Sequence, residues 1–259
     1  MDSAYVEDQY KLSYPYHVEH HWWHLARHAV IFYELKKVIE KDSCLLEIGC
    51  GRGIVTKYLR EREINCFGIE PASVVPLQEV KEFVRSESEP ASLSVAEREK
   101  YDVIVLFDVI EHILDPIAFL KPLRKLFPNL KYVVITVPGR AELWSNYDDF
   151  YGHHRRYSMK MIEDLARNLS WNIIHRGYFF HTLYIAIWAT IILRIKRSIK
   201  IDAPGKSARN IHRMFSLGQI WEYHLLPKNI PGTSIIACFS MLATGHDNAR
   251  PRDAEPGPR

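Results

Sequence analysis

The chain has 259 residues, of which 47% are hydrophobic, enough for one α/β domain with a large core and an added segment. The formal net charge of +3 is too small to indicate nucleic-acid binding. The four cysteines form no C-x-x-C pair, which argues against a zinc site and a disulfide framework and favours reduced, buried thiols in a cytoplasmic protein. The N-terminus lacks the basic region and apolar run of a secretory signal.

The predicted elements alternate between strands and helices along most of the chain. Strands are expected at residues 43–48, 65–69, 84–88, 102–107, 132–137, 171–180 and 234–243. Helices are expected at 54–62, 73–83, 116–127 (with Asp115 as N-cap) and directly after Ser158, which would be the N-cap of that helix. This alternation predicts a doubly wound, mostly parallel, seven-stranded α/β sheet. We expect a helical lid at residues 1–42, a main domain at 43–245 with an insertion at about 181–232, and a disordered tail at 246–259.

A glycine-rich turn follows the first predicted strand. Gly49, Gly51 and Gly53 alternate with other residues directly before a predicted helix. Glycine tolerates positive φ and close approach of a ligand, and the N–H groups of such a turn favour a polar or anionic one. A small residue belongs at position 54 in the dinucleotide fingerprint, and Ile54 therefore disfavours NAD or FAD. A turn that merely joins strand and helix is the structural alternative.

Acidic residues stand where three predicted strands end. They are Glu47, Glu70 and Asp108. Ligands of open α/β sheets bind outside the carboxyl ends of the strands. Glu70 follows the glycine turn by about twenty residues, the separation at which an acidic side chain meets ribose hydroxyls in such folds. A solvated loop carboxylate is the alternative for Glu70.

These motifs together resemble class I S-adenosylmethionine-dependent methyltransferases, among them bacterial groups similar to enzymes of ubiquinone biosynthesis. The resemblance covers residues 44–169 and is carried by Glu47-x-Gly49-x-Gly51-x-Gly53, Glu70, Asp108-Val-Ile-Glu-His-Ile and Tyr-Val-Val-Ile-Thr-Val-Pro at 132–138. It implies a Rossmann-like methyltransferase fold with S-adenosylmethionine as cofactor. The glycines would surround its methionine part, and Glu70 would bind the ribose hydroxyls.

The same resemblance implies roles for the remaining cofactor residues. Asp108 would lie near the methionine amino group or the acceptor, and Glu47 would organise the turn. Residues near Ser86 and Glu87 would contact the adenine, although the Gly-Asp pair usual in the family is absent there.

The segment at residues 19–27, Glu-His-His-Trp-Trp-His-Leu-Ala-Arg, is similar to an E-x-H-W-W-F-x-x-R motif of bacterial methyltransferases, with His24 in place of the Phe. The similarity implies a lid in which Trp22, Trp23 and Arg27 cover the site and exclude water. Aromatic faces also attract cations, which suits a sulfonium cofactor. Alternatively, the two tryptophans anchor an N-terminal helix to the sheet.

Three histidines are candidate general bases. His153 and His154 lie in a His-His-Arg-Arg-Tyr-Ser run that similar methyltransferases place near the acceptor, and His112 follows the fourth predicted strand. An imidazole titrates near neutrality and can accept a proton from a hydroxyl or amine. Each histidine can equally serve to hydrogen-bond a loop, and methyl transfer mostly requires alignment of the nucleophile. The spacing of His and Asp residues indicates no metal site.

The predicted insertion begins with an apolar run at residues 178–193, followed by a basic stretch that extends to residue 213. The run is shorter than the about twenty residues of a transmembrane helix. A helix lying on an anionic membrane surface at the inner face of the membrane fits this pattern. The alternatives are a helix packed on the domain or in a dimer interface.

The sequence therefore predicts methyl transfer to a small or lipid-linked acceptor, with oxygen preferred over nitrogen and carbon. A non-catalytic methyltransferase-like domain that acts as a membrane or partner module is the second hypothesis, and a NAD-dependent oxidoreductase is the third. Nothing in the sequence indicates an oligomeric state.

Overall fold

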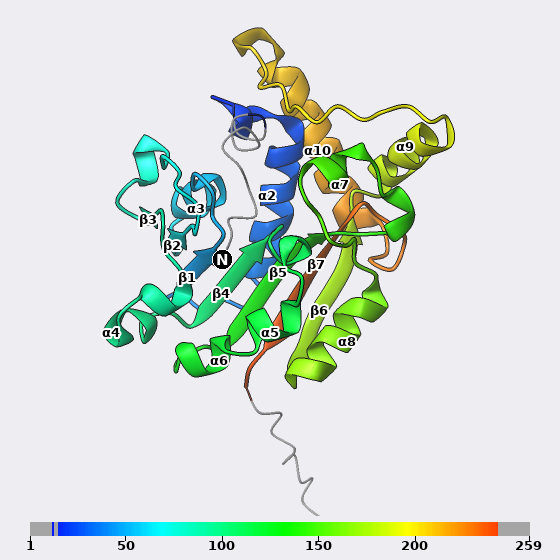
Figure 1. Ribbon diagram of the computed structural model, residues 1–259. Coiled ribbons are helices and arrows are strands. Elements are labelled where there is room, and N and C mark those ends of the chain that lie inside the picture. The colour runs from blue at the N-terminus through cyan, green and yellow to red at the C-terminus, as the bar shows by residue number, and fades with distance from the viewer. Residues whose placement is uncertain (1–11, 13–14, 243–259) are drawn as a thin grey trace, which may run out of the picture.

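The computed structural model describes residues 12 and 15–242, which form one seven-stranded sheet with helices on both faces (Figure 1). The strand order is β3-β2-β1-β4-β5-β7-β6, and β7 alone runs in the direction opposite to the other six strands. The strands are β1 (Cys44–Ile48), β2 (Asn65–Ile69), β3 (Val84–Arg85), β4 (Val103–Phe107), β5 (Tyr132–Pro138), β6 (Asn172–Phe179) and β7 (Ser234–Ser240). The predicted doubly wound, mostly parallel sheet is confirmed. The tail predicted at 246–259 lies outside the described residues.

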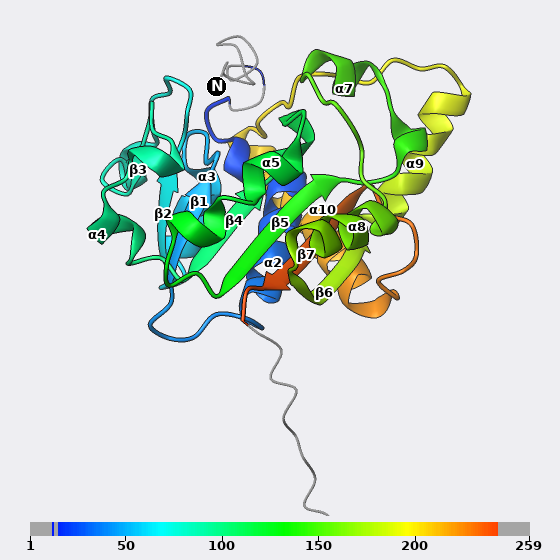
Figure 2. The same cartoon turned by 60° about the horizontal axis from the view of Figure 1, so that its bottom comes forward.

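Alternating side chains of the buried strands supply two cores. Leu46 and Ile104 pack on one face, and Leu45 and Val103 pack on the other. The first face is covered by α5 (Pro116–Leu120), α6 (Leu123–Leu126) and α8 (Met159–Leu169). The second is covered by α2 (Trp22–Leu35), α3 (Ile54–Arg60) and α10 (Arg209–Leu225), as Figure 2 shows from below. Strands covered on both faces are continuous apolar runs, which is why the sequence located them well.

Two predicted helices are wrong or incomplete because of proline. Residues 73–83 form no α-helix and contain only the single turn η2 (Gln78–Val80). Pro76 disfavours the α conformation of the residue before it, and the N–H of Leu77 donates to the carbonyl of Arg52 across the chain. Residues 116–127 are divided into α5 and α6 at Pro122, which has no N–H to donate.

The predicted helix caps are confirmed. Asp115 Oδ1 accepts from the N–H of Ala118 at 3.0 Å, and Ser158 Oγ accepts from the N–H of Met161 at 3.2 Å. These caps fix where α5 and α8 begin on the face opposite α2. The remaining short elements are α4 (Val95–Arg98), α7 (Asn146–Phe150), η1 (Val18–His20), η3 (Pro90–Ser92), η4 (Ile110–His112) and η5 (Ala141–Leu143).

A helical segment separates β6 from β7, where the sequence predicts an insertion. It comprises α9 (His181–Ile192), a connection that ends in η6 (Lys206–Ala208), and α10. The carboxylate of Glu222 on α10 accepts from the N–H groups of His181 and Thr182 and thereby caps α9. The hydroxyl of Tyr223 donates to Glu34, which fastens α10 to α2. In the described part of the chain, no helix has the length and hydrophobicity needed to cross a bilayer.

All four cysteines are free thiols, as predicted. Cys50, Cys66 and Cys238 are buried, whereas Cys44 at the start of β1 is only partly buried. Burial raises the pKa of Cys44 to about 11, so that it is protonated at neutral pH.

Candidate active site

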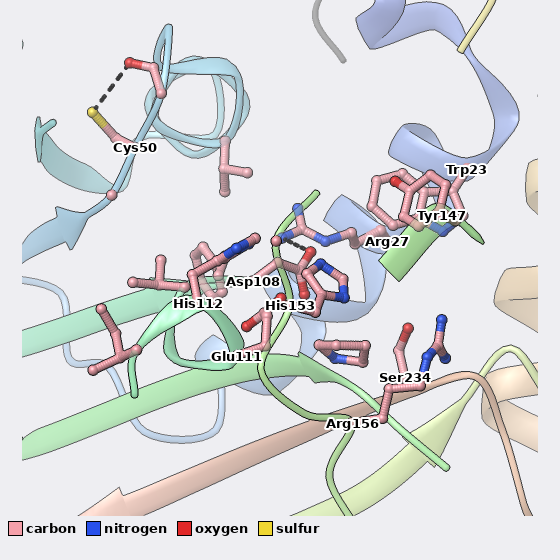
Figure 3. A pocket seen from close by; sticks show the side chains of 18 of the residues that line it. Trp23, Arg27, Cys50, Asp108, Glu111, His112, Tyr147, His153, Arg156 and Ser234 are labelled. Carbon is pink, nitrogen blue, oxygen red and sulfur yellow. Dashed lines mark hydrogen bonds and ion pairs between the residues drawn. The ribbon is translucent and has the colours of Figure 1, made fainter. Parts of the chain in front are cut away.

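A cavity of about 1310 Å³ opens at the carboxyl ends of the central strands (Figure 3). Its walls are the glycine turn after β1, helix α2, the loops that follow β4 and β5, helix α9 and the segment 196–201. The strand order reverses between β1 and β4, and this switch point is where open α/β sheets bind ligands. Most of the residues singled out in the sequence line this one cavity.

The glycine turn has the backbone that the sequence predicts. Gly49, Gly51 and Gly53 have φ values of 76°, 54° and 83°. A Cβ atom on Gly49 would lie 2.7 Å from Cγ2 of Val109, and one on Gly53 would lie 2.7 Å from Cγ2 of Val84. Positive φ and close packing together require glycine at these two positions.

Glu70 reaches back to this turn from the end of β2. Its Oε2 accepts from the N–H of Gly51 at 2.8 Å, and its Oε1 accepts from the N–H of Ala72 at 3.0 Å. The carboxylate is buried beside the cavity and is held in one orientation, with lone pairs left for further donors. Ser86 and Glu87 do not line the cavity; Glu89 and Pro90 do.

Glu47 lies beneath the turn and is almost fully buried. Its Oε2 accepts from the hydroxyl of Thr56 at 2.6 Å, which ties the end of β1 to helix α3. Burial raises the pKa of Glu47 to about 7. This environment is that of a carboxyl group that organises the turn.

Asp108 joins the end of β4 to helix α2. Its Oδ2 lies 2.7 Å from Nη2 of Arg27, and its Oδ1 accepts from the hydroxyl of Thr136 at 3.1 Å. Asp108 has a φ of 58°, a left-handed conformation that aspartate tolerates better than most residues. The guanidinium of Arg27 also lies 5.3 Å from the ring centre of Trp23. The sequence associates Arg27 with the acceptor lid and does not predict this ion pair.

Trp22 and Trp23 both line the cavity and both anchor helix α2. The two rings have centroids 6.3 Å from that of Phe180, which precedes α9. The backbone N–H of Trp22 donates to Nδ1 of His212 on α10. Each of the two tryptophans therefore forms part of the cavity wall and also anchors the helix by packing.

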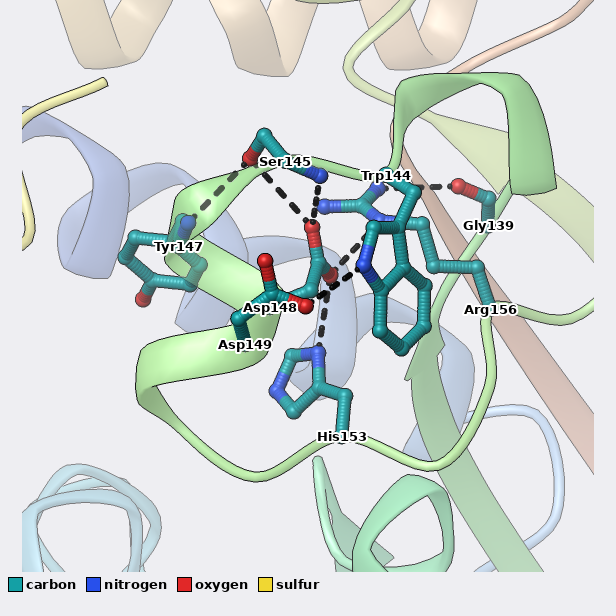
Figure 4. A network of polar contacts seen from close by, with 8 residues as sticks. All are labelled: Gly139, Trp144, Ser145, Tyr147, Asp148, Asp149, His153 and Arg156. Atoms are coloured by element: carbon teal, nitrogen blue, oxygen red, sulfur yellow. Dashed lines mark hydrogen bonds and ion pairs between the residues drawn. The ribbon is translucent and has the colours of Figure 1, made fainter. Parts of the chain in front are cut away.

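Behind the cavity, Asp148 organises a buried polar network (Figure 4). Its Oδ1 lies 2.9 Å from Nδ1 of His153 and accepts from Nε of Arg156 at 2.7 Å. Burial alone would raise the pKa of Asp148, but the hydrogen bond from His153 and the charge of Arg156 outweigh it and lower the pKa. Arg156 also donates to the carbonyl of Gly139, which links the network to the end of β5.

The three candidate bases have different environments. The rings of His112 and His153 are 4.8 Å apart, and both side chains are largely buried. Burial and the neighbouring His153 lower the pKa of His112 to about 4, which keeps it neutral at physiological pH. His154 is exposed at the mouth of the cavity, and its backbone N–H donates to the carbonyl of Glu111.

Glu111 completes a cluster with the two buried histidines. One potential ligand atom from each of Glu111, His112 and His153 lies within 4.8 Å of the others. Burial and the neighbouring Asp108 raise the pKa of Glu111 well above the usual range. A carboxylate and two imidazoles could hold a divalent cation. The sequence indicates no metal site because these residues belong to two loops that only the fold brings together.

Comparisons with known proteins agree with this geometry. Residues 18–176, more than half of the chain, match the family model described as "Methyltransferase domain". The chain belongs to this family. The resemblance to class I S-adenosylmethionine-dependent methyltransferases is thereby confirmed, and with it the predicted cofactor.

Individual relatives are distant. A ubiquinone biosynthesis O-methyltransferase of Aliivibrio fischeri is 26% identical over 124 residues, which cover 40% of this chain and 52% of that protein. The chain spans about half the length of the curated relatives it matches. Solved structures share the fold. Phosphoethanolamine N-methyltransferase 2 of Haemonchus contortus, with S-adenosyl-L-methionine, has a TM-score of 0.51 at 15% identity and covers 83% of this chain and 52% of its own. A possible histamine N-methyltransferase of Thermotoga maritima has a TM-score of 0.50 at 16% identity and covers 85% and 92%.

Proposed function

We propose that the protein transfers a methyl group from S-adenosylmethionine to an acceptor that binds in the same cavity. The observation that carries this proposal is the contact between the Gly51 N–H and the Glu70 carboxylate, at the same sheet edge as Asp108. The turn would hold the methionine part of the cofactor, and Glu70 would accept from the ribose hydroxyls. Direct displacement at the methyl carbon requires the acceptor to be aligned with the S–CH₃ bond.

The acceptor would lie between Asp108 and the Asp148 network, where the residues of the lid and the candidate bases converge. His112 and His153 are the side chains placed to accept a proton from an acceptor hydroxyl, since His112 is neutral at physiological pH. Oxygen is the proposed methylated atom. The O-methyltransferase names of the matched relatives support this choice, at 26% identity.

A lipid-linked acceptor and a peripheral position on a membrane form the second part of the proposal. Eleven of the twenty exposed large hydrophobic side chains in the described residues belong to 185–225, among them Trp188 and Trp221. The same stretch carries Arg194, Lys200, Lys206, Arg209 and Arg213, all outside the cavity wall. Apolar side chains beside clustered cations suit an anionic membrane surface.

Flotation with vesicles tests the membrane contact. The wild type should float with vesicles that contain phosphatidylglycerol and remain behind with pure phosphatidylcholine, and Trp188→Ser/Trp221→Ser should lose most of the bound fraction. Trp144→Ser, an exposed tryptophan outside this stretch, is the matched control. Equal flotation of all three proteins would contradict the proposed surface.

Enzymatic turnover is tested with the purified chain and, separately, a lipid extract and an aqueous extract of cells. Release of S-adenosylhomocysteine, followed by mass spectrometry of the methylated material, should identify the acceptor and the methylated atom. Gly51→Asp should abolish the release. Binding of S-adenosylmethionine without turnover on either lipid or aqueous extract would favour the non-catalytic module instead.

A further inference from the structure

Most charged side chains of the cavity are separated by sign; the exception is Arg27 of α2, which pairs with Asp108. The wall from residue 47 to 119 contributes six carboxyl groups and no lysine or arginine: Glu47, Glu70, Glu89, Asp108, Glu111 and Asp115. The wall from residue 138 to 234 contributes Arg156, Lys196 and Arg197 and no aspartate or glutamate. The acidic half contains the glycine turn and therefore the proposed cofactor site, where it suits the sulfonium and ammonium groups of S-adenosylmethionine. The basic half faces the acceptor.

Two of the three cations in the basic half lack a local counter-ion. Arg156 is neutralised by Asp148, whose carboxylate lies behind the cavity wall. Within the described residues, neither Lys196 nor Arg197 has a carboxylate oxygen within 4.0 Å. Burial and the neighbouring charge of Arg156 lower the pKa of Arg197. Asp148 also acts electrostatically on Arg197, so one carboxylate faces three cations and the end of the cavity near α7 carries a net positive charge.

Arg197 is held in place as a binding residue would be. Its backbone N–H donates to Oδ1 of Asn146 at 2.9 Å, and its carbonyl accepts from Nδ2 of the same amide at 2.9 Å. The hydroxyl of Tyr151 donates to the carbonyl of Ile199 and fixes the following residues. The guanidinium lies 4.8 Å from the ring centre of Tyr147.

One nitrogen of this guanidinium is unsatisfied. Nη1 of Arg197 is buried and finds no hydrogen-bond acceptor among the described residues. A buried donor without an acceptor costs free energy, and a fixed guanidinium fork is matched to carboxylate or phosphate oxygens. An anionic ligand group would satisfy this nitrogen at little further loss of side-chain freedom.

Apolar residues continue the wall next to these cations. Ile201, on the connection that also carries Lys196 and Arg197, and Leu183 and Ile187 of α9 line the same cavity. We propose that the acceptor carries an anionic group, a carboxylate or a phosphate, which Arg197 and Lys196 bind while its apolar body lies against α9. This inference rests on the proposed methyl transfer and specifies the chemical class of the acceptor.

Calorimetry on protein saturated with S-adenosylhomocysteine tests the anion site. Decyl phosphate and decanoate are the anionic probes, and decyl maltoside is the neutral probe with the same chain. We expect both anionic probes to bind at least about tenfold more tightly than the maltoside. Arg197→Gln should weaken their binding by at least about tenfold, the usual effect of losing one charge-assisted hydrogen bond. Competition of inorganic phosphate with decyl phosphate would support a small phosphorylated acceptor. Tighter binding of anionic probes with longer alkyl chains would support a lipid.

Arg194→Gln is the matched control because it removes the same charge from an exposed position on the same segment, outside the cavity wall. It should bind the probes as the wild type does. Equal affinity for anionic and neutral probes, or unchanged binding in Arg197→Gln, would overturn the inference. Failure of S-adenosylhomocysteine to bind the wild type would instead overturn the proposed function, and its normal binding to Arg197→Gln shows that this variant is folded.

Discussion

The guanidinium of Arg27 lies 2.7 Å from the carboxylate of Asp108 and fastens helix α2 to the end of strand β4. Arg27 is buried, whereas about a third of the Asp108 side chain is exposed to the cavity. The hydroxyl of Thr136 donates to the same carboxylate from the neighbouring strand. A residue of the predicted lid and a residue of the predicted cofactor site thus form one structural unit.

Breaking this ion pair should destabilise the fold. Arg27→Met and Asp108→Asn should each lower the free energy of unfolding by about 1–3 kcal/mol, because each leaves the other side chain without its counter-charge, and only Asp108 is partly exposed. The double variant should lose less than the sum, with a coupling of about 1–2 kcal/mol in urea unfolding. The exposed pair Lys160 and Asp164 is the control, and its coupling should stay below about 0.5 kcal/mol. Additive losses at Arg27 and Asp108 would refute the role of the pair.

The glycine turn leaves no room for a methyl group at Gly49. Gly49→Ala should lower the thermal midpoint, because the added methyl group clashes with Val109 and alanine is strained at a positive φ. The free energy of unfolding should fall by about 2–4 kcal/mol in total. Gly152→Ala separates the two effects, because Gly152 has a φ of 68° and open space where a Cβ atom would lie. Gly152→Ala should therefore lower the free energy of unfolding by only about 1 kcal/mol. Equal losses at both positions would show that packing against Val109 is unimportant.

Affinity for S-adenosylmethionine should depend on Glu70 and Gly51. Glu70→Ala should weaken binding by about 10- to 100-fold, since the turn loses its acceptor and the ribose loses its proposed partner. Gly51→Asp should abolish binding, because it adds a side chain at positive φ and a second negative charge beside Glu70. Exposed Glu79→Gln serves as the control in calorimetry. Unchanged affinity in both site variants would refute the assignment of the donor site.

Buried His24 should make the fold sensitive to acid. Burial lowers the pKa of His24 from its ordinary 6.5 to about 3. Between these two pH values, the unfolded chain binds a proton at this histidine and the folded chain does not. Neutral His24 therefore contributes fully to the free energy of unfolding above about pH 6.5. This contribution is lost as the pH falls toward the pKa of His24 in the folded protein. His24→Phe should therefore lose about 2 kcal/mol less than the wild type between pH 7.5 and 5.0 in urea unfolding.

The same variant should also be more stable at pH 7.5. Both ring nitrogens of His24 are buried and have no hydrogen-bond partner among the described residues. Replacing them with carbon should raise the free energy of unfolding by about 1 kcal/mol. His224→Phe, at an exposed position, is the control and should show the pH dependence of the wild type. An identical pH dependence in His24→Phe would disprove the contribution of His24.

The local sequence pattern predicts the strands because strands buried on both faces are continuous apolar runs. β4 is an unbroken apolar run with every residue buried, and β2 begins and ends where the sequence places it. The segment at 73–83 fails because its conformation depends on a distant carbonyl, that of Arg52, as well as on Pro76. Helical periodicity in a short window contains neither piece of information.

The cofactor half of the site is predictable for a similar reason. Gly49, Gly51, Glu70 and Asp108 all lie at strand ends, and parallel strands end at one edge of the sheet. The acceptor half is not predictable in this way. Asp148 is recognisable as a buried ion-pair partner only once Arg156 and His153 are seen around it.

The sequence by itself determined the order of the strands along the chain, the glycine turn and the family, because these follow from local burial and from residues with no substitute at positive φ. Tertiary structure alone decided the pairing of Arg27 with Asp108 and the fixed position of Arg197 against Tyr147. Those relationships join residues far apart in the chain, and their energies depend on distance and burial in three dimensions. Neither distance nor burial is a property of a linear pattern.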